Sequence, residues 1–376
     1  MKKIMIISYM FYPENNPRAF RAYELAKELS KQNEVVVITK KISNRKKENF
    51  RLIEIESGFF LNKNQSEKSE KSVIAVKEGR VRKKIFASLA KIYNYFFYSR
   101  EIEFSYEIVK KLNNMFEKVD VVISVANPFA CHIGSWYYLK NKRNIKLILD
   151  YGDPFYMNPV FKLPFYFKSL EKTILKRADW IVLPVDEARK AFSIFGEEIE
   201  KKIKIVPQGI NINDIEIEKY EKNNIPTFMY AGAFYEKIRN PINFFEKLNE
   251  ITENYKMFLY TNMETLKKTD FGLKILEEIK KNNRIELKDK IPRKECINKM
   301  SKMDFLINIE NLGGVQVPSK LIDYGIAKRP VYSFNQENFN QDIFREFLVE
   351  NYKNSVKIDI SPFDIKKVTE KFEELF

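Results

Sequence analysis

The stretch IMIISYMFYPENNPRAFRAYELAKELSKQNEVVVIT, residues 4–39, decides the fold class. It begins with a short apolar run, Ile4–Ser8, of the kind found in parallel strands that are covered on both faces. A loop with two prolines follows, and apolar residues then recur at helical spacing over about Ala19–Ser30. Residues 34–39 form a second apolar run. The stretch therefore predicts a strand–helix–strand unit with a right-handed crossover.

The same alternation continues along the chain and restarts after a break. Residues 211–226 are polar, charged and poor in apolar side chains, so we expect a linker there. The pattern on either side predicts an α/β fold of the GT-B type, with two Rossmann-like, doubly wound domains facing each other across a cleft. The first domain spans 1–210 and the second 227–376, with the last helix free to pack back on the first. Further strands are expected at 119–125, 146–150, 180–184, 204–207, 228–231, 257–260, 285–287, 305–309 and 330–333.

Composition narrows the classes of function. The length of 376 residues exceeds the roughly 250–300 residues of a single core. The formal net charge of +15 favours anionic partners, although a lysine-rich composition that reflects genome bias explains it equally well. Two distant cysteines, Cys131 and Cys296, and a single histidine argue against a disulfide framework and exclude a multi-histidine metal site, so a cytoplasmic location is expected. The sequence has no apolar run of about 18 residues, so we expect no transmembrane helix.

The sharpest chemical signal is QVPSKLIDY at 316–324. Ser319 is a good N-cap, so a helix is expected to start there, and the free N–H groups of a helix start favour a phosphate. Lys320 in the first turn is unfavourable for the helix dipole unless an anion binds nearby. Asp323 lies one turn along on the same face, where its carboxylate could accept hydrogen bonds from two ribose hydroxyls. The alternative is an ordinary capped helix with a solvated lysine and aspartate.

Together with three further motifs, this segment resembles glycosyltransferase family 4. The opening stretch 4–39 is similar to the start of that family. VPQGI at 206–210 resembles the turn before the family's linker, and YAGA at 230–233 with RNP at 239–241 resembles the start of its second domain. Residues 317–331 resemble its PSK-x-x-(E/D)-Y…G-x-P-V segment. The matches occur in the family's order and span most of the chain.

The resemblance implies a donor site for a nucleotide sugar in the second domain. Gly232 would let the backbone approach the phosphates. Arg239 and Lys320 would neutralise the diphosphate, with Lys237 as a competitor for the role of Arg239, whose alternative is an exposed turn residue. Asp323 would bind the ribose. The family's other acidic residue falls on Val315, and the remaining donor-site candidates, two of which lie upstream and could substitute for it, are Glu310, Gly314, Val317 and Ser319.

The resemblance places the acceptor and the catalytic surroundings in the first domain. Asp150 and Asp153 belong to DYGDP, which follows a buried strand, and would act as a base or a clamp for the acceptor hydroxyl. The alternative is a structural cap and a plain turn. The motif is similar to D-x-R-D-P in part of the family, with Gly152 in place of the arginine.

Three more residues of the first domain are candidates. His132 follows another strand end and is a third catalytic candidate, with a satisfied core histidine as the alternative. Asn16 and Arg18 would lie at the top of the first strand, close to the diphosphate. The usual glycines of that loop are absent here.

These features predict a glycosyltransferase that moves a sugar from a nucleoside-diphosphate sugar to a saccharide or lipid-linked acceptor. The resemblance implies retention of anomeric configuration and a role in surface-polysaccharide synthesis. No cofactor is expected besides the donor, and no metal, because Asp150 and Asp153 are spaced one residue too far for the Asp-x-Asp of metal-dependent transferases. One alternative is a nucleotide-sugar 2-epimerase of the same fold, but such epimerases depend on several acidic and histidine groups and this chain has one histidine. The other alternative is a non-catalytic basic binding protein or degenerate transferase. No nucleic-acid partner is expected, since no motif for one is present.

Residues 80–100 carry four bases followed by apolar side chains at helical spacing. This pattern is typical of an interfacial helix, which would give peripheral contact with the inner leaflet of the cytoplasmic membrane. An amphipathic helix packed on the domain's own core explains the pattern equally well.

Overall fold

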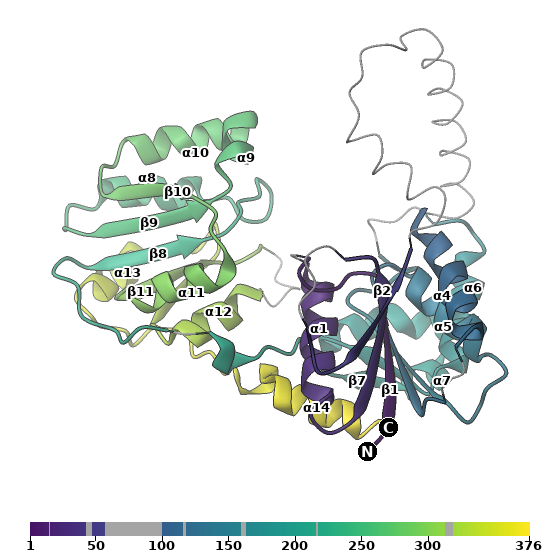
Figure 1. The fold of residues 1–376 in the computed structure, drawn as a ribbon. Coiled ribbons are helices and arrows are strands. Elements are labelled where there is room, and N and C mark those ends of the chain that lie inside the picture. The colour runs from purple at the N-terminus through teal and green to yellow at the C-terminus, as the bar shows by residue number, and fades with distance from the viewer. Residues whose placement is uncertain are drawn as a thin grey trace, which may run out of the picture. The chain divides into compact units, whose positions relative to one another are not determined.

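A computed structural model describes residues 1–14, 16–42, 47–56, 100–115, 118–158, 163–215, 217–312 and 319–376 (Figure 1). The chain divides into two compact units. The first comprises Met1–Ile210 and Phe363–Phe376, and the second comprises Asn211–Pro362. Each unit contains one parallel sheet. Most of the predicted interfacial helix, residues 80–99, lies outside the described residues.

The sheet of the first unit has the order β3-β2-β1-β4-β5-β6-β7, and all its strand pairs are parallel. Its order reverses between β1 and β4, which makes this pair the switch point where ligands bind in such sheets. The strands are β1 (Lys3–Ser8), β2 (Glu34–Lys40), β3 (Arg51–Ile55), β4 (Val121–Val125), β5 (Lys146–Asp150), β6 (Trp180–Leu183) and β7 (Ile203–Ile205).

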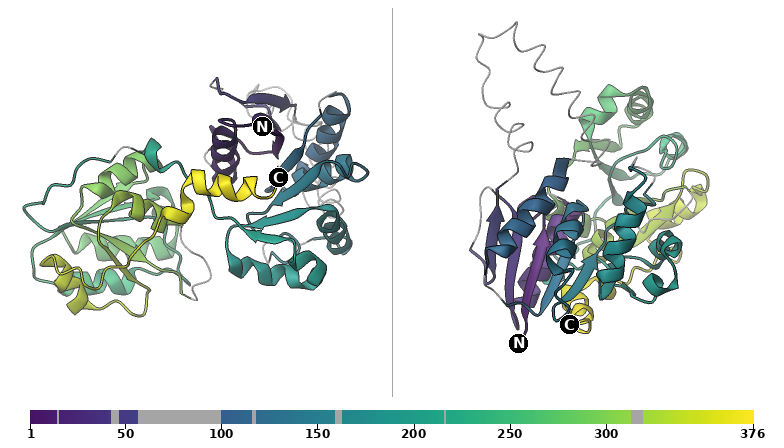
Figure 2. Two further views of the ribbon diagram at one scale, coloured as in Figure 1. Left: turned by 90° about the horizontal axis from the view of Figure 1, so that it is seen from below. Right: turned by 90° about the vertical axis from the view of Figure 1, so that its right-hand side faces the viewer.

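Helices cover both faces of this sheet because successive side chains of each strand point to opposite sides. In β1, Ile4 and Ile6 pack toward α1 (Pro17–Leu29) and α14 (Ile365–Glu373). Met5 and Ile7 pack with the apolar residues of the helices on the other face, α4 (Glu103–Asn113), α5 (Ala130–Leu139) and α6 (Phe167–Arg177). Figure 2 shows α14, in yellow, beside α1. The short elements are η1 (Arg100–Ile102), η2 (Asp186–Phe195), α7 (Glu197–Glu200), η3 (Ile212–Asp214) and η4 (Ser361–Phe363).

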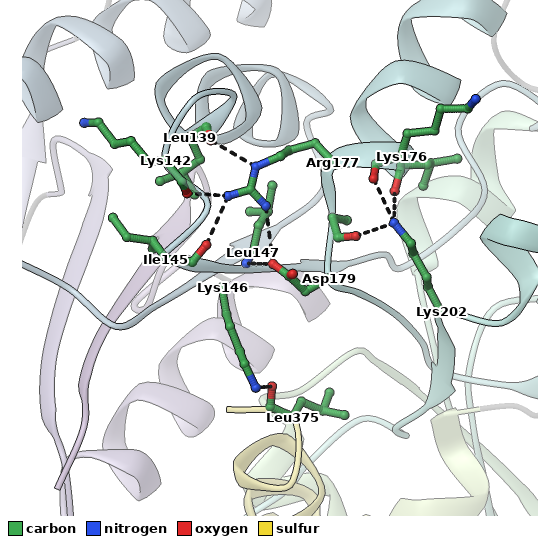
Figure 3. A network of polar contacts seen from close by, with 12 residues as sticks. Leu139, Lys142, Ile145, Lys146, Leu147, Lys176, Arg177, Asp179, Lys202 and Leu375 are labelled. Carbon is green, nitrogen blue, oxygen red and sulfur yellow. Dashed lines mark hydrogen bonds and ion pairs between the residues drawn. The ribbon is translucent and has the colours of Figure 1, made fainter.

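A polar network ties the amino-terminal edge of this sheet to the helices (Figure 3). The guanidinium of Arg177 is buried and bonds Asp179, whose carboxylate also accepts from the Leu147 backbone N–H at 2.7 Å. Lys202 donates from its Nζ to the backbone carbonyls at the end of α6. Arg177 also donates at 2.7–3.0 Å to the carbonyl oxygens of Leu139, Lys142 and Ile145. Charged side chains therefore fix this edge, whereas ligands in such sheets bind at the opposite edge, beyond the carboxyl ends of the strands.

The sheet of the second unit has the order β10-β9-β8-β11-β12, again all parallel, with its switch point between β8 and β11. The strands are β8 (Thr227–Ala231), β9 (Lys256–Thr261), β10 (Ile285–Asp289), β11 (Phe305–Ile309) and β12 (Val331–Phe334). The helices are α8 (Ile242–Glu250), α9 (Met263–Lys268), α10 (Asp270–Lys280), α11 (Arg293–Ser301), α12 (Ser319–Ala327) and α13 (Gln341–Leu348).

Part of the segment predicted as a linker is docked on the second unit. The Tyr220 hydroxyl donates to Oδ1 of Asp304 at 2.5 Å, and the Thr227 backbone N–H donates to Oδ2 at 2.7 Å. The guanidinium of Arg329 lies 3.4 Å from the centre of the Tyr220 ring. These contacts anchor the chain just before β8. In the described ranges, no helix combines the length and apolar composition needed to span a bilayer.

Candidate functional site

The switch point of the second sheet carries a lysine that lies on a glycine. Gly232 directly follows β8, and Lys320 stands in the first turn of α12. The Nζ of Lys320 occupies the space of a side chain at Gly232, since a Cβ built there would lie 1.5 Å from it. The ammonium also lies 3.4 Å from the Tyr230 hydroxyl and 4.8 Å from the centre of that ring. Only glycine at 232 permits this position.

A second cation is buried beside the first. The Arg239 side chain is 7% exposed, and its Nε has no hydrogen-bond partner among the described residues. Backbone hydrogen bonds in both directions between Tyr235 and Arg239 close the turn that delivers it. Desolvation, and then the neighbouring Arg239, lower the pKa of Lys320 to about 7. Within the described ranges neither cation forms a salt bridge, so this corner of the unit is poised to accept an anion.

Asp323 lies three residues after Lys320 on the same helix face and is held by a residue that the sequence did not single out. Arg293, the first residue of α11, donates from Nε at 2.8 Å and from Nη2 at 2.5 Å to Oδ1 of Asp323. Desolvation raises the pKa of Asp323, and Arg293 opposes that rise. The only sequence signal for Arg293 is its position shortly after the end of β10, at the sheet edge where ligands bind.

Of the other predicted donor residues, Lys237, Glu310 and Ser319 lie in the described ranges, and Gly314 and Val317 do not. Lys237 is exposed, unlike Arg239. The Oε1 of Glu310, directly after β11, accepts from the Ser333 hydroxyl at 2.6 Å, so this carboxylate has a partner within its own sheet. Two predicted residues, Gly314 and Val317, lie outside the described residues, and so does Val315. The helix α12 begins at Ser319, as predicted, although its side chain is not described.

In the first unit, Asp150 forms a buried ion pair that the sequence did not predict. Arg21 donates from Nε to Oδ2 at 2.7 Å and from Nη2 to Oδ1 at 2.8 Å, and both side chains are almost fully buried. Arg21 also donates to the carbonyls of Val206 and Pro207. With both oxygens occupied, Asp150 has the geometry of a structural residue rather than that of a free base.

Arg18 lies over Gly152, in the space that a side chain at 152 would fill. A Cβ at Gly152 would be 2.4 Å from both Cζ and Nε of Arg18. No described residue accepts a hydrogen bond from the buried Nη1 of Arg18, and burial lowers the pKa of its guanidinium. The charges of Asp150 and Asp153 oppose that shift. Asp153 is exposed, so of the two predicted carboxylates, Asp150 and Asp153, it is the accessible one. Asn16 caps α1 by accepting from the Arg18 backbone N–H at 2.8 Å.

His132 is fully buried in the first turns of α5. Its Nδ1 lies 2.8 Å from the Ser124 hydroxyl, and its ring packs 4.5 Å from that of Tyr151. Its Nε2 has no hydrogen-bond partner among the described residues. Desolvation lowers the pKa of His132 to about 3, so the ring is neutral at physiological pH.

The structure adds a buried carboxylic acid behind the Asp153 loop. Glu171 on α6 is 1% exposed and accepts from the Tyr156 backbone N–H at 3.0 Å. Desolvation raises its pKa to about 7. Phe155 in the same loop stacks on Phe129 with ring centroids 3.9 Å apart. Nothing in the sequence pattern around Glu171 distinguishes it from a solvated helical glutamate.

Side chains of the metal-binding types are dispersed over the described residues. In the portion of the chain that the structure describes, no three histidine, cysteine, aspartate or glutamate side chains gather in a way that could hold a metal ion. The expectation of a reaction without metal or cofactor stays a prediction.

Neither a protein-family model nor a curated protein sequence matches the chain. Solved structures of glycosyltransferases do. A glycosyltransferase from Rickettsia africae ESF-5 has a TM-score of 0.60 and 15% identity, covering 100% of this chain and 97% of that one. Sucrose-phosphate synthase from Thermosynechococcus elongatus has a TM-score of 0.59 and 12% identity, with 100% and 98% covered. HepE from Anabaena, in complex with UDP and glucose, has a TM-score of 0.56 and 10% identity, with 100% and 99% covered.

Similarity at these identities is evidence of fold. The full coverage and the two parallel sheets confirm the predicted fold class, in which strands and helices alternate in two Rossmann-like units as in GT-B glycosyltransferases. The cleft expected between the units stays a prediction. The chain has the two-unit α/β fold of the GT-B glycosyltransferases.

Proposed function

We propose that this chain is a glycosyltransferase whose donor is a nucleoside-diphosphate sugar. The observation that carries the proposal is the pair formed by Arg239, which is buried, and Lys320, which is partly buried, at the switch point of the second sheet, where neither forms a salt bridge with a described residue. Two like charges side by side in a desolvated corner are unfavourable without an anion, and a diphosphate would relieve their repulsion. In the reaction the same pair would stabilise the charge that develops on the leaving diphosphate.

The surrounding residues fit the rest of such a donor. The N-terminus of α12, a helix of nine residues, lies in the same segment as Lys320 and favours phosphate oxygens. Asp323, one turn further on, would accept hydrogen bonds from ribose hydroxyls. Because fixed cations are present at this position, we infer that the reaction needs no metal to neutralise the diphosphate.

For the first unit we propose an acceptor role centred on Asp153. Its exposed carboxylate follows the carboxyl end of β5, where it would accept the proton of the acceptor hydroxyl or orient that hydroxyl. Asp150 would position the loop through Arg21 instead of acting as a base. His132 would act as a neutral hydrogen-bonding group, because its pKa is too low for a cation at physiological pH.

The comparisons support this proposal without extending it to a substrate. HepE binds UDP and glucose, and another similar structure is the lipopolysaccharide outer core galactosyltransferase WaaB. By the family resemblance we further propose a saccharide or lipid-linked acceptor at the inner face of the cytoplasmic membrane, retention of configuration, and a role in surface-polysaccharide synthesis.

The first test is a thermal-shift screen with UDP, GDP, dTDP, CMP and their common sugar conjugates, in the presence of EDTA. The wild type is compared with Lys320→Ala and Arg239→Ala, and with Lys274→Ala as a matched control at an exposed position on α10. We expect one nucleoside diphosphate to raise the melting temperature by mass action, with a smaller rise in the two site variants and an unchanged rise in the control.

Two results would count against the proposal. If the wild type responds to none of the nucleotides, the site does not bind a nucleotide donor. If a nucleotide binds but both site variants respond as the wild type does, the donor lies elsewhere. Once the base is known, incubation of the donor without acceptor separates a transferase from an epimerase, because only the epimerase converts the sugar under these conditions.

A further inference from the structure

The contact between Arg293 and Asp323 has an uneven geometry. Both donors of the guanidinium, Nε and Nη2, point at Oδ1, and no described residue donates to Oδ2. A guanidinium can instead grip both oxygens of a carboxylate with two parallel hydrogen bonds, as Arg21 does with Asp150. One oxygen of Asp323 is therefore held, while the other has no hydrogen-bond donor within the described ranges.

The carboxylate is less accessible than its partner. The Asp323 side chain is 20% exposed and that of Arg293 is 42% exposed. An exposed ion pair contributes little to stability, so stability alone is a weak reason for this contact. The location of the contact suggests a role in ligand binding, because Asp323 lies one turn along α12 from Lys320, whose ammonium is part of the proposed diphosphate site.

We propose that Arg293 is a positioning residue of the nucleotide site, which holds Oδ1 of Asp323 so that Oδ2 faces the ribose hydroxyls of a nucleoside diphosphate. The inference rests on the proposed function and deepens it, since it divides the ligand between two sets of residues. Lys320 and Arg239 take the diphosphate. The Arg293–Asp323 pair takes the ribose and never touches the phosphates.

The charges around Asp323 add a pH dependence. Desolvation raises the pKa of this carboxyl, and Arg293 from α11 and Lys320 from its own helix lower it. The other titratable neighbours are Cys296 on α11 and Tyr324 on α12, both with strongly raised pKa values that keep them neutral. Removing Arg293 raises the pKa of Asp323 further, so the loss of ribose binding on acidification moves to a higher pH.

The experiment is calorimetric titration with two probes, inorganic pyrophosphate and the nucleoside diphosphate that the wild type binds. It uses the full chain as wild type, Arg293→Gln, Arg293→Lys, Asp323→Asn and the double variant with glutamine and asparagine. For Arg293→Gln we expect about tenfold weaker binding of the nucleoside diphosphate and unchanged binding of pyrophosphate. Arg293→Lys is expected to weaken nucleotide binding less than Arg293→Gln does, because lysine keeps the positive charge but lacks the planar guanidinium that donates two hydrogen bonds.

A further comparison separates positioning from direct contact. In the Asp323→Asn background, Arg293→Gln is expected to have no additional effect, since the group that it holds is already altered. The pH at which the Arg293→Gln variant loses nucleotide affinity is expected to lie above that of the wild type.

The outcomes are distinguishable. Equal weakening of both probes by Arg293→Gln makes Arg293 a phosphate ligand and overturns the inference, and unchanged nucleotide binding makes it a plain surface ion pair and also overturns it. If the wild type binds pyrophosphate but no nucleoside diphosphate, the proposed function fails, and the inference fails with it.

Discussion

The absence of a side chain at Gly152 leaves room for the partly buried side chain of Arg18 at the edge of the first sheet. Because a Cβ at this position would lie 2.4 Å from the Arg18 guanidinium, we expect Gly152→Ala to displace Arg18 and to lower the free energy of unfolding by about 1 kcal/mol. Urea unfolding of the variant measures this.

The matched control for that prediction is Gly152→Ala combined with Arg18→Ala, where the collision partner is gone. The added methyl is expected to cost little in this background, so the two substitutions are not additive. Additive costs would show that Gly152 and Arg18 do not compete for the same space.

Glu171 predicts an unusual pH dependence at the residue scale. Its pKa is raised to about 7 in the folded chain from an ordinary 4.5, so within that window the folded state keeps a proton that the unfolded state has lost. Its stabilising contribution is complete below the lower value and disappears as the pH rises through the upper one. The loss is on the order of 3 kcal/mol.

Glu171→Gln tests this because an amide oxygen can still accept from the Tyr156 backbone N–H but does not titrate. Between about pH 5 and about pH 8, unfolding free energies of the wild type are expected to fall more steeply than those of the variant. Parallel curves for the two proteins would rule out Glu171 as the titrating group.

At the scale of elements, the hydrogen bonds of Arg177 allow a prediction about stability. Arg177→Ala removes the guanidinium donor from the carbonyls of Leu139, Lys142 and Ile145, of which the Leu139 carbonyl keeps the backbone N–H of Lys142, and we expect a loss of about 3 kcal/mol in unfolding free energy. Amide exchange in β5 is expected to accelerate. Arg143→Ala, at an exposed position in the same turn, serves as the control and should change neither quantity.

How far the sequence predicts these elements depends on their burial. The central strands of both sheets are mostly apolar and fully buried runs such as Ile4–Ser8 and Phe305–Ile309, because helices cover them on both faces. The edge strand β3 was missed, since RLIEI is only partly buried and reads as mixed polar sequence. Element ends moved by one or two residues, as for the helix expected from Ala19 that begins at Pro17.

The sequence predicts only those residues of the candidate site that belong to one short motif. Lys320 and Asp323 share one turn of one helix, so their spacing alone places them on one face. The contact of Arg293 with Asp323 and that of Arg18 with Gly152 join residues that are far apart in the chain. A single sequence contains no periodicity that links such positions, and the burial that removes Asp150 from the accessible surface comes from Arg21 on another element.

For the whole molecule, the two units are expected to respond to different perturbations. Phe372 on α14 is fully buried in the core of the first unit, where it packs on the Arg21 guanidinium. We expect Phe372→Ala to cost about 3–5 kcal/mol and to lower the thermal transition of the first unit, while a bound nucleoside diphosphate raises that of the second. Scanning calorimetry resolves the two, and a single transition that both changes move together would contradict independent units.

The return of α14 to the first unit makes the order of synthesis matter. The face of the first sheet that α14 covers is complete only after residues 365–373 have left the ribosome, although the rest of that unit is made more than 150 residues earlier. Domains generally fold as they emerge, yet here the second unit, made of one continuous segment, is finished first. Until residues 365–373 have been synthesised, the apolar side chains of the first sheet and α1 that pack on α14 lack that cover.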